Sequence, residues 1–366
     1  METYEQLKNE EYRQKIKALL LELPDYCTSF INSIIDKQPR TRLSYLQDLR
    51  VFFEFLRQNN PACKNVDAKN IGINILDSLT REDIVEYDSW LESYYLKDED
   101  GKSRHYTNSA AGRKRKLSSL RSFYNFLCNT AEYINNNPTL KVAMPKVHEK
   151  EIRTLDSYEL DKLLDLYDQE YKNALELYKN TPEEKRTRRI VIGPAATMRD
   201  LAICHLFLGT GLRISELVGI NTLDVKWDTG RVNIVRKGGD YDHIFMPPDV
   251  LADVSNYYFN YRDVFEPFSE DDALFLSNKH CRITTRHIER KISQYIEKAL
   301  GKNTGLTPHK FRATFGTNYY RKNKDIYATA GVLGHKSVET TRKSYAKPSE
   351  KAKENMKDIN IRNIED

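Results

Sequence analysis

The sequence lacks the features of a membrane or secreted protein. Its 366 residues contain no uninterrupted apolar run of the roughly 18 residues that a membrane helix needs. The first residues, METYEQLKNEEYRQK, are charged and do not contain the apolar core of a secretory signal. We therefore expect a cytoplasmic protein without a membrane segment.

Cysteine motifs are missing as well. The five cysteines are odd in number and none is spaced as Cys-x-x-Cys; they are Cys27, Cys63, Cys128, Cys204 and Cys281. Such a set favours neither a disulfide framework nor a zinc site. We therefore expect reduced thiols and neither a metal nor another cofactor.

A phosphate-binding loop and a strong charge excess are also absent. The pattern Gly-x-x-x-x-Gly-Lys-[Ser/Thr] does not occur, and neither does an Asp-x-Asp-x-Thr motif, which argues against a kinase or a phosphatase. Lys and Arg number 58 and Asp and Glu 53, a net charge of +5 that suits a polyanionic partner without establishing one. With 39% hydrophobic residues, the chain is long and apolar enough for two or three globular domains.

Helical patterns dominate the first half of the chain. Apolar residues recur at intervals of three and four, as Leu49, Phe52 and Leu56 do, and so fall on one face of a helix. Thr80, with Asp83 three residues later, forms a capping box that starts another helix. Helices are expected over residues 2–23, 25–36, 39–59, 84–96 and 108–131.

The helix expected from residue 108 carries a basic face. Lys114 and Arg121 lie together on it, on a different side from the apolar residues that would be buried. A basic face with a buried back is suited to the phosphates of a DNA duplex, whereas the alternative is a charged face that is merely solvated. The candidate DNA contacts in this half are Arg42, Arg113, Lys114, Arg115 and Arg121.

A basic segment punctuated by prolines separates the two halves. Residues 135–153 contain Pro138 and Pro145 and show no apolar periodicity, which is typical of a linker. We place the domain boundary near residue 150, so that the domains are 1–150 and 151–366.

Beyond this boundary, Asp156 or Ser157 caps a new helix. The pattern then weakens, and the charged tract 168–197 is expected to be an exposed insertion.

The second half contains an arginine directly after a glycine pair. In the segment GTGLRISEL, residues 209–217, Arg213 stands where a turn leads into a helix, so that its guanidinium can bind a phosphate. Glu216, three residues later, would orient an active-site side chain. An arginine at such a place often only solvates the surface, so the residues downstream decide its role.

After Arg213 the pattern becomes that of strands. The β-branched run 231–235 is followed by a Gly-Gly turn and a return strand at 243–247, which predicts a β-hairpin with Lys237 at its tip. A lysine at a hairpin tip is usually just solvated. A long amine there can nevertheless donate a proton to a leaving oxygen, which an arginine cannot do.

Two histidine motifs and a tyrosine follow. In TPHKFR, residues 307–312, His309 and Arg312 share one face of a helix that starts at a proline. In LGHKS, residues 333–337, His335 precedes Tyr345 by ten positions. Each residue alone is more often structural than catalytic. The ordered set, together with the arginine and the lysine above, is much more specific.

This set resembles the tyrosine recombinase family, which includes phage integrases and Xer recombinases. All six catalytic positions of the family have a matching residue type in the right order: Arg213, Lys237, His309, Arg312, His335 and Tyr345. The sequence departs from the commonest pattern in three ways. Ala313 stands where histidine is frequent, the spacing from His335 to Tyr345 is one residue longer than in many Xer proteins, and the tract near Lys185 is inserted.

The resemblance implies a fold and a domain arrangement. The fold is mainly α with a small antiparallel β-sheet in the catalytic domain. Residues 1–150 would form a helical, SAM-like core-binding domain, and residues 151–366 the tyrosine recombinase catalytic domain with a C-terminal tail. The two domains would make a C-shaped clamp around double-stranded DNA, and four copies would act together as a tetramer on two recombination sites.

The resemblance also implies a reaction. Tyr345 would attack a DNA phosphodiester and become joined to the 3′ phosphate, while Arg213 and Arg312 neutralise the charge on the nonbridging oxygens. His309 and His335 would add hydrogen bonds, and Lys237 would protonate the departing 5′ oxygen. Neither a metal nor ATP is needed. The enzyme would thus be a site-specific DNA recombinase.

Two alternatives stay open at this point. A type IB-like DNA topoisomerase uses similar residues but relaxes supercoils without a partner duplex. A non-catalytic DNA-binding regulator would need only the basic helices. The sequence leaves open the DNA target, any accessory proteins, and whether the enzyme resolves chromosome dimers or integrates and excises a mobile element. We expect the tail, residues 351–366, to pack on a neighbouring protomer.

Overall fold

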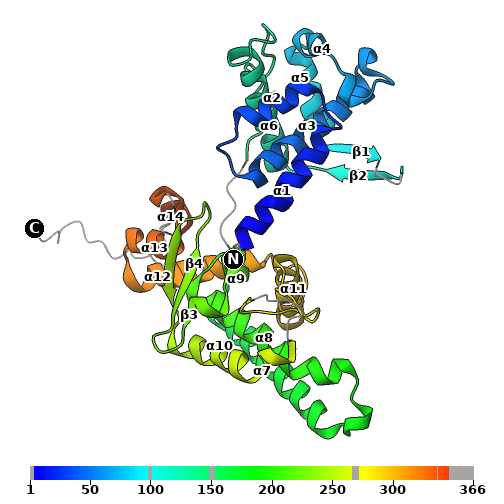
Figure 1. Ribbon diagram of the computed structural model, residues 1–366. Helices are drawn as coiled ribbons and strands as arrows, with labels where there is room; N and C mark the ends of the chain where they lie inside the picture. Colours follow the sequence, from blue (N-terminus) through cyan, green and yellow to red (C-terminus); the bar gives the residue numbers. More distant parts are fainter. Residues whose placement is uncertain (1–3, 98–100, 148–152, 266–271, 336, 346–366) are drawn as a thin grey trace, which may run out of the picture. The chain divides into compact units, whose positions relative to one another are not determined.

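The computed structural model of the chain is shown in Figure 1 and describes residues 4–97, 101–147, 153–265, 272–335 and 337–345. The chain forms two compact units, Met1–Lys150 and Glu151–Asp366. The described residues are mainly helical and contain two small antiparallel sheets, one in each unit. This is the fold class that the resemblance implies. The predicted position of the tail, residues 351–366, lies outside the described residues.

The first unit is a bundle of helices around an aromatic core. Helix α3 is central, and its Phe52 and Phe53 are completely buried, as are Phe123 and Tyr124 of α6. Their rings meet edge to face or tilted, for example Phe52 and Tyr124 at 6.5 Å, an arrangement that aromatic pairs prefer. The helices are α1 (Tyr4–Leu20), α2 (Asp25–Ser33), α3 (Pro39–Asn59), α4 (Ile73–Ser78), α5 (Arg81–Trp90) and α6 (Ala110–Asn129).

Helix α5 begins as predicted but ends early. The capping box of Thr80 and Asp83 is present at its start. The prediction that the helix continues to residue 96 was wrong, because β1 (Ser93–Lys97) pairs there with β2 (Ser103–Thr107). Aromatic residues favour this ribbon, and the ring of Tyr94 stacks on Tyr106 across the strands at 5.5 Å.

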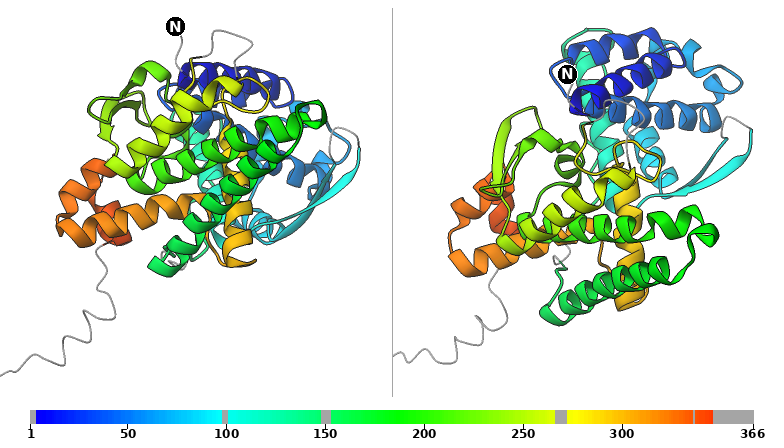
Figure 2. Two further views of the ribbon diagram at one scale, coloured as in Figure 1. Left: turned by 90° about the horizontal axis from the view of Figure 1, so that it is seen from below. Right: turned by 60° about the horizontal axis from the view of Figure 1, so that its bottom comes forward.

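The second unit is built on two long antiparallel helices, α7 (Ser157–Asn180) and α8 (Arg188–Thr210), which lie side by side in Figure 2. Asp156 caps α7. The tract 168–197, predicted to be an exposed insertion, is mostly exposed or half-buried, and most of it belongs to these two helices. Its many charged residues weakened the helical pattern in the sequence.

Helix α8 is the core helix of this unit. By length and composition it is apolar enough to cross a membrane, but 67% of its most apolar window is buried inside the protein. It packs against α7 and α10 (Pro248–Asn260) on different sides. Burial among other helices accounts for its apolar composition.

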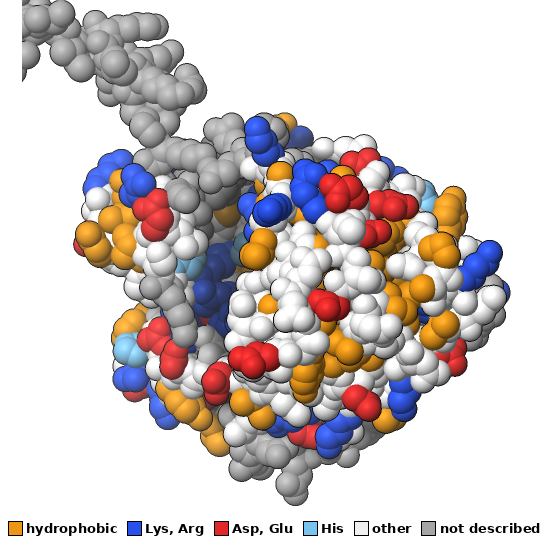
Figure 3. All heavy atoms as spheres, turned by 90° about the horizontal axis from the view of Figure 1, so that it is seen from above, with side chains coloured by type: hydrophobic (Ala, Val, Ile, Leu, Met, Phe, Trp, Pro, Cys, Tyr) orange, Lys and Arg blue, Asp and Glu red, His pale blue; other side chains and the backbone are white. Residues whose placement is uncertain are grey.

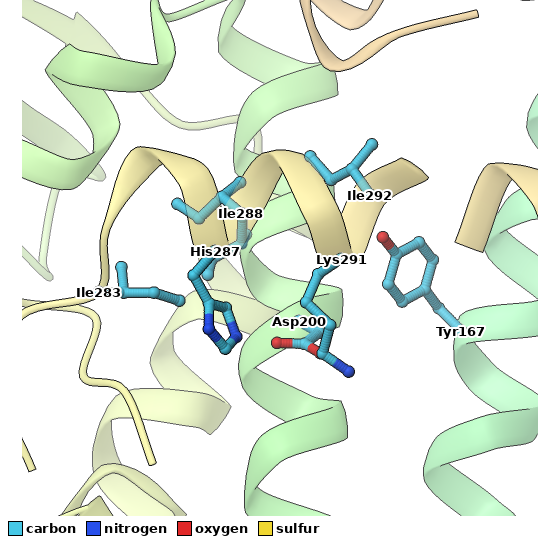
Figure 4. A pocket seen from close by; sticks show the side chains of 8 residues that line it. Tyr167, Asp200, Ile283, His287, Ile288, Lys291 and Ile292 are labelled. Carbon is cyan, nitrogen blue, oxygen red and sulfur yellow. The ribbon is translucent and has the colours of Figure 1, made fainter. Parts of the chain in front are cut away.

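A small pocket, lined mostly by apolar side chains with a few charged ones, lies among α7, α8 and α11 (Thr285–Leu300), as Figure 4 shows. The carboxylate of Asp200 lies 3.0 Å from the ammonium of Lys291 and 2.8 Å from the buried guanidinium of Arg199. Tyr167 and His287 line the same pocket. This ion-pair network joins α8 to α11, and we regard it as structural because the two buried charges, Arg199 and Asp200, are paired with each other and Asp200 also with Lys291.

The predicted β-hairpin is present. Strand β4 (Arg231–Val235) pairs with β5 (Tyr241–Phe245) on one side and with the short β3 (Val225–Lys226) on the other. Gly238 and Gly239 at its turn have φ values of +115° and +93°, which glycine adopts without strain.

Four further helices complete the second unit around this hairpin, which Figure 1 shows beside α12. They are α9 (Ile214–Gly219), α12 (Pro308–Asn323), α13 (Ile326–Leu333) and α14 (Val338–Tyr345). Pro308 occupies the first position of α12, as predicted, where its missing N–H costs no helical hydrogen bond.

Candidate active site

The C-terminal end of helix α13 is the centre of the candidate site. The last carbonyls of a helix have no helical partner and carry the negative end of its dipole, so they attract cations. Three consecutive carbonyls each accept a hydrogen bond from one arginine: Val332 from Arg236 at 2.9 Å, Leu333 from Arg312, and Gly334 from Arg213 at 2.8 Å. One helix end thus gathers three guanidinium groups from three separate segments.

Arg213 stands at the N-cap of α9, directly after the end of α8. The chain turns there through Gly211, which has a φ of +62°. A Cβ atom at Gly211 would lie 2.3 Å from a ring carbon of Phe315, so no larger residue fits without movement. The glycine pair noted in the sequence therefore lets α8 end tightly against α12. About a quarter of the Arg213 side chain, 26%, stays exposed.

Glu216 connects two of the arginines. Its Oε1 lies 2.6 Å from Nη1 of Arg213, and its Oε2 lies 3.3 Å from Nη1 of Arg236. The backbone N–H of Arg213 also donates to Oε2 at 2.7 Å. The carboxylate is almost fully buried and is paired on both oxygens, so it orients guanidinium groups, the role expected from the sequence.

Arg312 reaches the same place from α12. It is buried, with 3% of its surface exposed, and its Nη1 donates to the carbonyl of Gly211 at 2.6 Å. With Leu333 as its other partner, it ties the end of α8 to the end of α13. A buried guanidinium must satisfy its donors, and two backbone carbonyls accept hydrogen bonds from this one.

His335 follows directly on the helix end and lies in the field of these cations. Burial and the charges of Arg312, Arg213 and Arg236 lower its pKa to about 4, so the imidazole is neutral at physiological pH. Its Nδ1 lies 2.7 Å from Oγ1 of Thr341, which is completely buried. Neutral imidazole has one donor and one acceptor nitrogen, so this contact bears on which nitrogen carries the proton.

His309 lies at the start of α12 and is more open to solvent. Partial burial and the charges of Arg312, Lys310 and Arg213 lower the pKa of its imidazole as well. Both histidines are therefore influenced by the same arginines. The structure thus brings together four of the six residues that the sequence selected, namely Arg213, His309, Arg312 and His335.

The other two selected residues have different positions. Lys237 lies at the exposed turn of the β4–β5 hairpin, directly after Arg236. Tyr345 is the last residue of α14, and its side chain lies outside what the structure describes. The backbone places Tyr345 one helical turn after Thr341 on α14.

Sequence reasoning missed Arg236. It is 94% removed from solvent, with an exposed fraction of 6%, although it stands beside an exposed lysine. A signal was present in the sequence. Val232 and Ile234 are buried on β4, and the two-residue period of a strand puts Arg236 on the same inward side. A charged residue in phase with a buried face marks a paired, structurally important group.

The predicted DNA contacts lie in the first unit and differ in their surroundings. Arg113 pairs with Glu92 and lies 3.7 Å from Asp88, whereas Lys114 is exposed. Arg115 is half exposed, with its Nη1 2.5 Å from the buried carboxylate of Asp48.

Arg121 and Arg42 are less accessible than Lys114. One nitrogen of Arg121, Nη2, donates to the carbonyls of Thr139 and Val142 at 2.9 Å each, which ties the segment after α6 to that helix. Arg42 is half-buried on α3. Of the five residues selected from the sequence, Lys114 and Arg115 present their charges most openly.

The face in Figure 3 carries basic and acidic side chains scattered among apolar and uncharged ones. The net charge of the whole chain is small, at +5. The concentration of positive charge at the end of α13 is therefore a local feature. A partly exposed guanidinium among buried ones suits a small anionic group such as a phosphate.

Known proteins are similar to this chain over most of its length. The profile of the Phage integrase family matches residues 166–352, and that of the phage integrase N-terminal SAM-like domain matches residues 28–130. Tyrosine recombinase XerC of Caldanaerobacter subterraneus is 29% identical over 331 residues, covering 88% of this chain and 82% of that protein. Tyrosine recombinase XerC of Shigella flexneri is 30% identical over 240 residues, covering 66% of this chain and 71% of that protein.

Solved structures show a similar fold. The Tn1549 transposon integrase in complex with transposon right end DNA has a TM-score of 0.62 at 17% identity, covering 91% of this chain and 98% of that one. The XerH site-specific recombinase bound to difH substrate has a TM-score of 0.58 at 17% identity, covering 90% and 83%.

Proposed function

Because this chain belongs to the phage integrase family of tyrosine recombinases, enzymes that cleave and rejoin DNA, we propose that it is a site-specific DNA recombinase acting through a covalent 3′-phosphotyrosine intermediate. The observation that carries the proposal is the group of three arginines at the end of α13, with two neutral histidines beside it. A scissile phosphate requires such a positively charged, hydrogen-bonding environment.

The arginines stabilise the transition state. When a nucleophile attacks a phosphodiester, the phosphorus becomes five-coordinate and its two nonbridging oxygens carry negative charge. Arg213, which is partly exposed, binds these oxygens directly, and Arg312 adds positive charge from its buried position. His335 and His309 donate further hydrogen bonds from neutral rings. No metal ion is required for charge neutralisation, since the guanidinium groups supply it.

The proposed step exchanges one ester bond for another. The bond between the Tyr345 oxygen and phosphorus forms, and the bond from phosphorus to the 5′ oxygen breaks. The phenolic proton passes to a base, for which the neutral imidazole of His309 is the candidate, and the 5′ oxygen takes a proton from the Lys237 ammonium. A 5′ hydroxyl from a second duplex reverses the step and reseals the strand without ATP.

The first unit supplies the remaining grip on DNA in this proposal. It matches the SAM-like domain profile, and the exposed charges of Lys114 and Arg115 on α6 suit duplex phosphates. In this proposal both units, divided near residue 150, contact double-stranded DNA. Strand exchange joins two duplexes, so we propose a homo-tetramer; lambda integrase, a structural neighbour at a TM-score of 0.56, forms a tetramer on a Holliday junction. Action on DNA implies a cytoplasmic location.

Two biological uses share this chemistry. The XerC relatives favour chromosome dimer resolution, and the transposon integrase favours integration or excision of a mobile element. Both require a specific recombination site and a partner duplex. Either use separates this enzyme from a topoisomerase, which needs no second duplex.

Covalent capture tests the proposal. Nicked duplexes from a random-sequence library are incubated with the full chain, adducts that survive denaturation are recovered, and the attached residue is mapped by mass spectrometry. We expect attachment at Tyr345, and we expect Tyr345→Phe to abolish the adduct while leaving DNA binding measurable. An adduct formed by Tyr345→Phe would contradict the nucleophile, and relaxation of a plasmid without recombination of paired captured sites would favour a topoisomerase.

A further inference from the structure

We infer that Arg236 is a positioning residue. It anchors the β4–β5 hairpin to the group of three arginines and so holds Lys237 where its ammonium can donate a proton to the leaving oxygen. This inference rests on the proposed function, because it assigns Lys237 the role of acid. It adds a residue that acts through another and does not itself contact DNA.

The contacts of Arg236 reach three different parts of the second unit. Its Nε donates to Oδ2 of Asp242, on the opposite strand, at 2.8 Å. Its Nη1 lies 3.3 Å from Oε2 of Glu216, which also holds Arg213, and its Nη2 donates to the carbonyl of Val332 at 2.9 Å. One side chain therefore joins the hairpin to α9 and to the end of α13.

The backbone packs closely around this guanidinium. A Cβ atom at Gly334 would lie 2.9 Å from Nε of Arg236 and 3.0 Å from its Cζ. Gly334 has a φ of +59° and directly precedes His335. The guanidinium is thus in contact with the turn that presents the histidine, and there is no room for a larger residue between them.

The hairpin needs such an anchor because the backbone of its turn can adopt many conformations. Lys237 is followed by Gly238 and Gly239, and glycine restricts the backbone least. The turn is closed by the backbone of Arg236, whose N–H donates to the carbonyl of Asp240 at 2.8 Å and whose carbonyl accepts from Gly239 at 3.0 Å. The residue that closes the turn is therefore also the one whose side chain is fixed in the core.

A direct role for Arg236 at the phosphate fits the geometry less well. Its exposed fraction is 6%, and the guanidinium is surrounded by Asp242, Glu216, Val332 and Gly334. The positive charge is also shared with two carboxylates. It is suited to holding other groups in place, which is how buried and fully paired arginines act near a reacting centre.

A leaving group that needs no proton tests this inference. In a duplex with a sulfur atom in place of the 5′ oxygen at the cleaved bond, the departing thiolate is stable because a thiol has a pKa of about 8.5. The substrate is a duplex captured by the wild-type enzyme, made in the oxygen and the sulfur form. Cleavage of both forms is compared for wild type, Lys237→Ala, Arg236→Gln, Asp242→Asn and the control Arg231→Gln, which removes the same charge from an exposed position on the same strand.

We expect Arg236→Gln to behave like a weaker form of Lys237→Ala. Cleavage of the oxygen form should fall about 100-fold, the lower end of what an acid contributes, and cleavage of the sulfur form should return to within about threefold of wild type. Asp242→Asn, which keeps the arginine, should show the same pattern to a smaller extent. Arg231→Gln should have the wild-type ratio of the two rates.

Hydrogen exchange supplies a readout without DNA. In Arg236→Gln we expect faster exchange over residues 232–245, with the first unit unchanged, and this also establishes that the variant is folded. If Arg236→Gln is unfolded, the cleavage rates of Asp242→Asn on the two forms of the duplex test the inference in its place.

Three results would overturn the inference. The first is that Arg236→Gln cleaves the oxygen form as fast as wild type does. If that variant is unfolded, the same result for Asp242→Asn overturns the inference. The second is an equal loss on both forms while Lys237→Ala is rescued by sulfur, which would place Arg236 with the phosphate-binding groups. The third is a Lys237→Ala that sulfur does not rescue, which would overturn the acid role itself while leaving the covalent capture at Tyr345 intact.

Discussion

The imidazole of His335 meets the hydroxyl of Thr341, with Nδ1 and Oγ1 2.7 Å apart. Thr341 belongs to α14 and lies one helical turn before Tyr345. A hydroxyl that donates to Nδ1 leaves the proton of the neutral ring on Nε2, which is the form that can donate to a phosphate. The contact therefore links the helix that carries the proposed nucleophile to the orientation of a histidine in the site.

Replacing Thr341 by valine should slow DNA cleavage about fivefold, because valine has the same shape but cannot hold the imidazole, and one such hydrogen bond contributes about 1 kcal/mol. Thr341→Ser should restore most of the rate. Single-turnover cleavage gives the rate, and ¹⁵N NMR of His335 gives the protonated nitrogen. Thr340→Val, at an exposed neighbouring position, is the control. Unchanged NMR signals of His335 in Thr341→Val would contradict the proposed contact.

Arg213→Lys should reduce the cleavage rate by about 100-fold or more, in the range found when one donor to a transition-state oxyanion is removed. Lysine keeps the charge but cannot contact Glu216, the carbonyl of Gly334 and a phosphate at the same time. The rate of covalent adduct formation measures the effect, with Arg231→Lys, the same exchange at an exposed position, as the control. Equal rates for Arg213→Lys and wild type would remove Arg213 from the site.

Acid should destabilise the protein partly through His335. In the unfolded chain this imidazole takes up a proton near pH 6.5, but in the folded protein only near pH 4. Between these values the unfolded state binds more protons, so lowering the pH from 6.5 to 4 lowers the free energy of unfolding, while above pH 6.5 the histidine has no effect. Urea unfolding at several pH values should show a smaller decline for His335→Gln than for wild type. Identical declines would mean that the pKa is not lowered.

Two glycines near the end of α13 should respond oppositely to alanine. Gly334→Ala should lower the free energy of unfolding by about 1–3 kcal/mol, because φ is +59° and the new methyl group would contact the Arg236 guanidinium. Gly331→Ala should be neutral or stabilising by up to about 1 kcal/mol, because Gly331 is helical and a Cβ there meets nothing within 4 Å. Denaturant titration of the two variants measures the difference, and equal stabilities would contradict the close packing of Gly334.

Two basic residues of α6 should separate DNA binding from folding. Lys114→Gln should weaken binding to a random-sequence duplex and reduce the salt dependence by about one unit in the log–log slope, since it removes one phosphate contact. Arg121→Gln should instead lower the stability of the first unit by about 1–3 kcal/mol, because two backbone carbonyls lose their donor. An unchanged salt slope for Lys114→Gln would place that residue away from DNA.

Predictions from the sequence succeeded where neighbouring residues decide the structure and failed where contacts with another segment decide it. Local patterns were read correctly where a few neighbouring residues decide the structure, as in the capping box of Thr80 and Asp83 or the hairpin before and after Gly238. It failed after Trp90, where the chain turns into a ribbon, and over 168–197 it predicted the exposure but not the two helices. After Trp90 the pairing of β1 with β2 outweighs the local helical pattern, and the sequence analysis did not foresee that pairing.

The sequence by itself determined the family and the ordered set of reactive residue types. The motifs around Arg213, His309 and His335 are short, and the residue types in them are those that the chemistry needs. Only the tertiary structure decided how these residues are held. The three arginines come from positions 213, 236 and 312 and meet because α13 ends in carbonyls that need donors. That need arises from the fold, which is why the partners of Arg236 and Thr341 are known only from the structure.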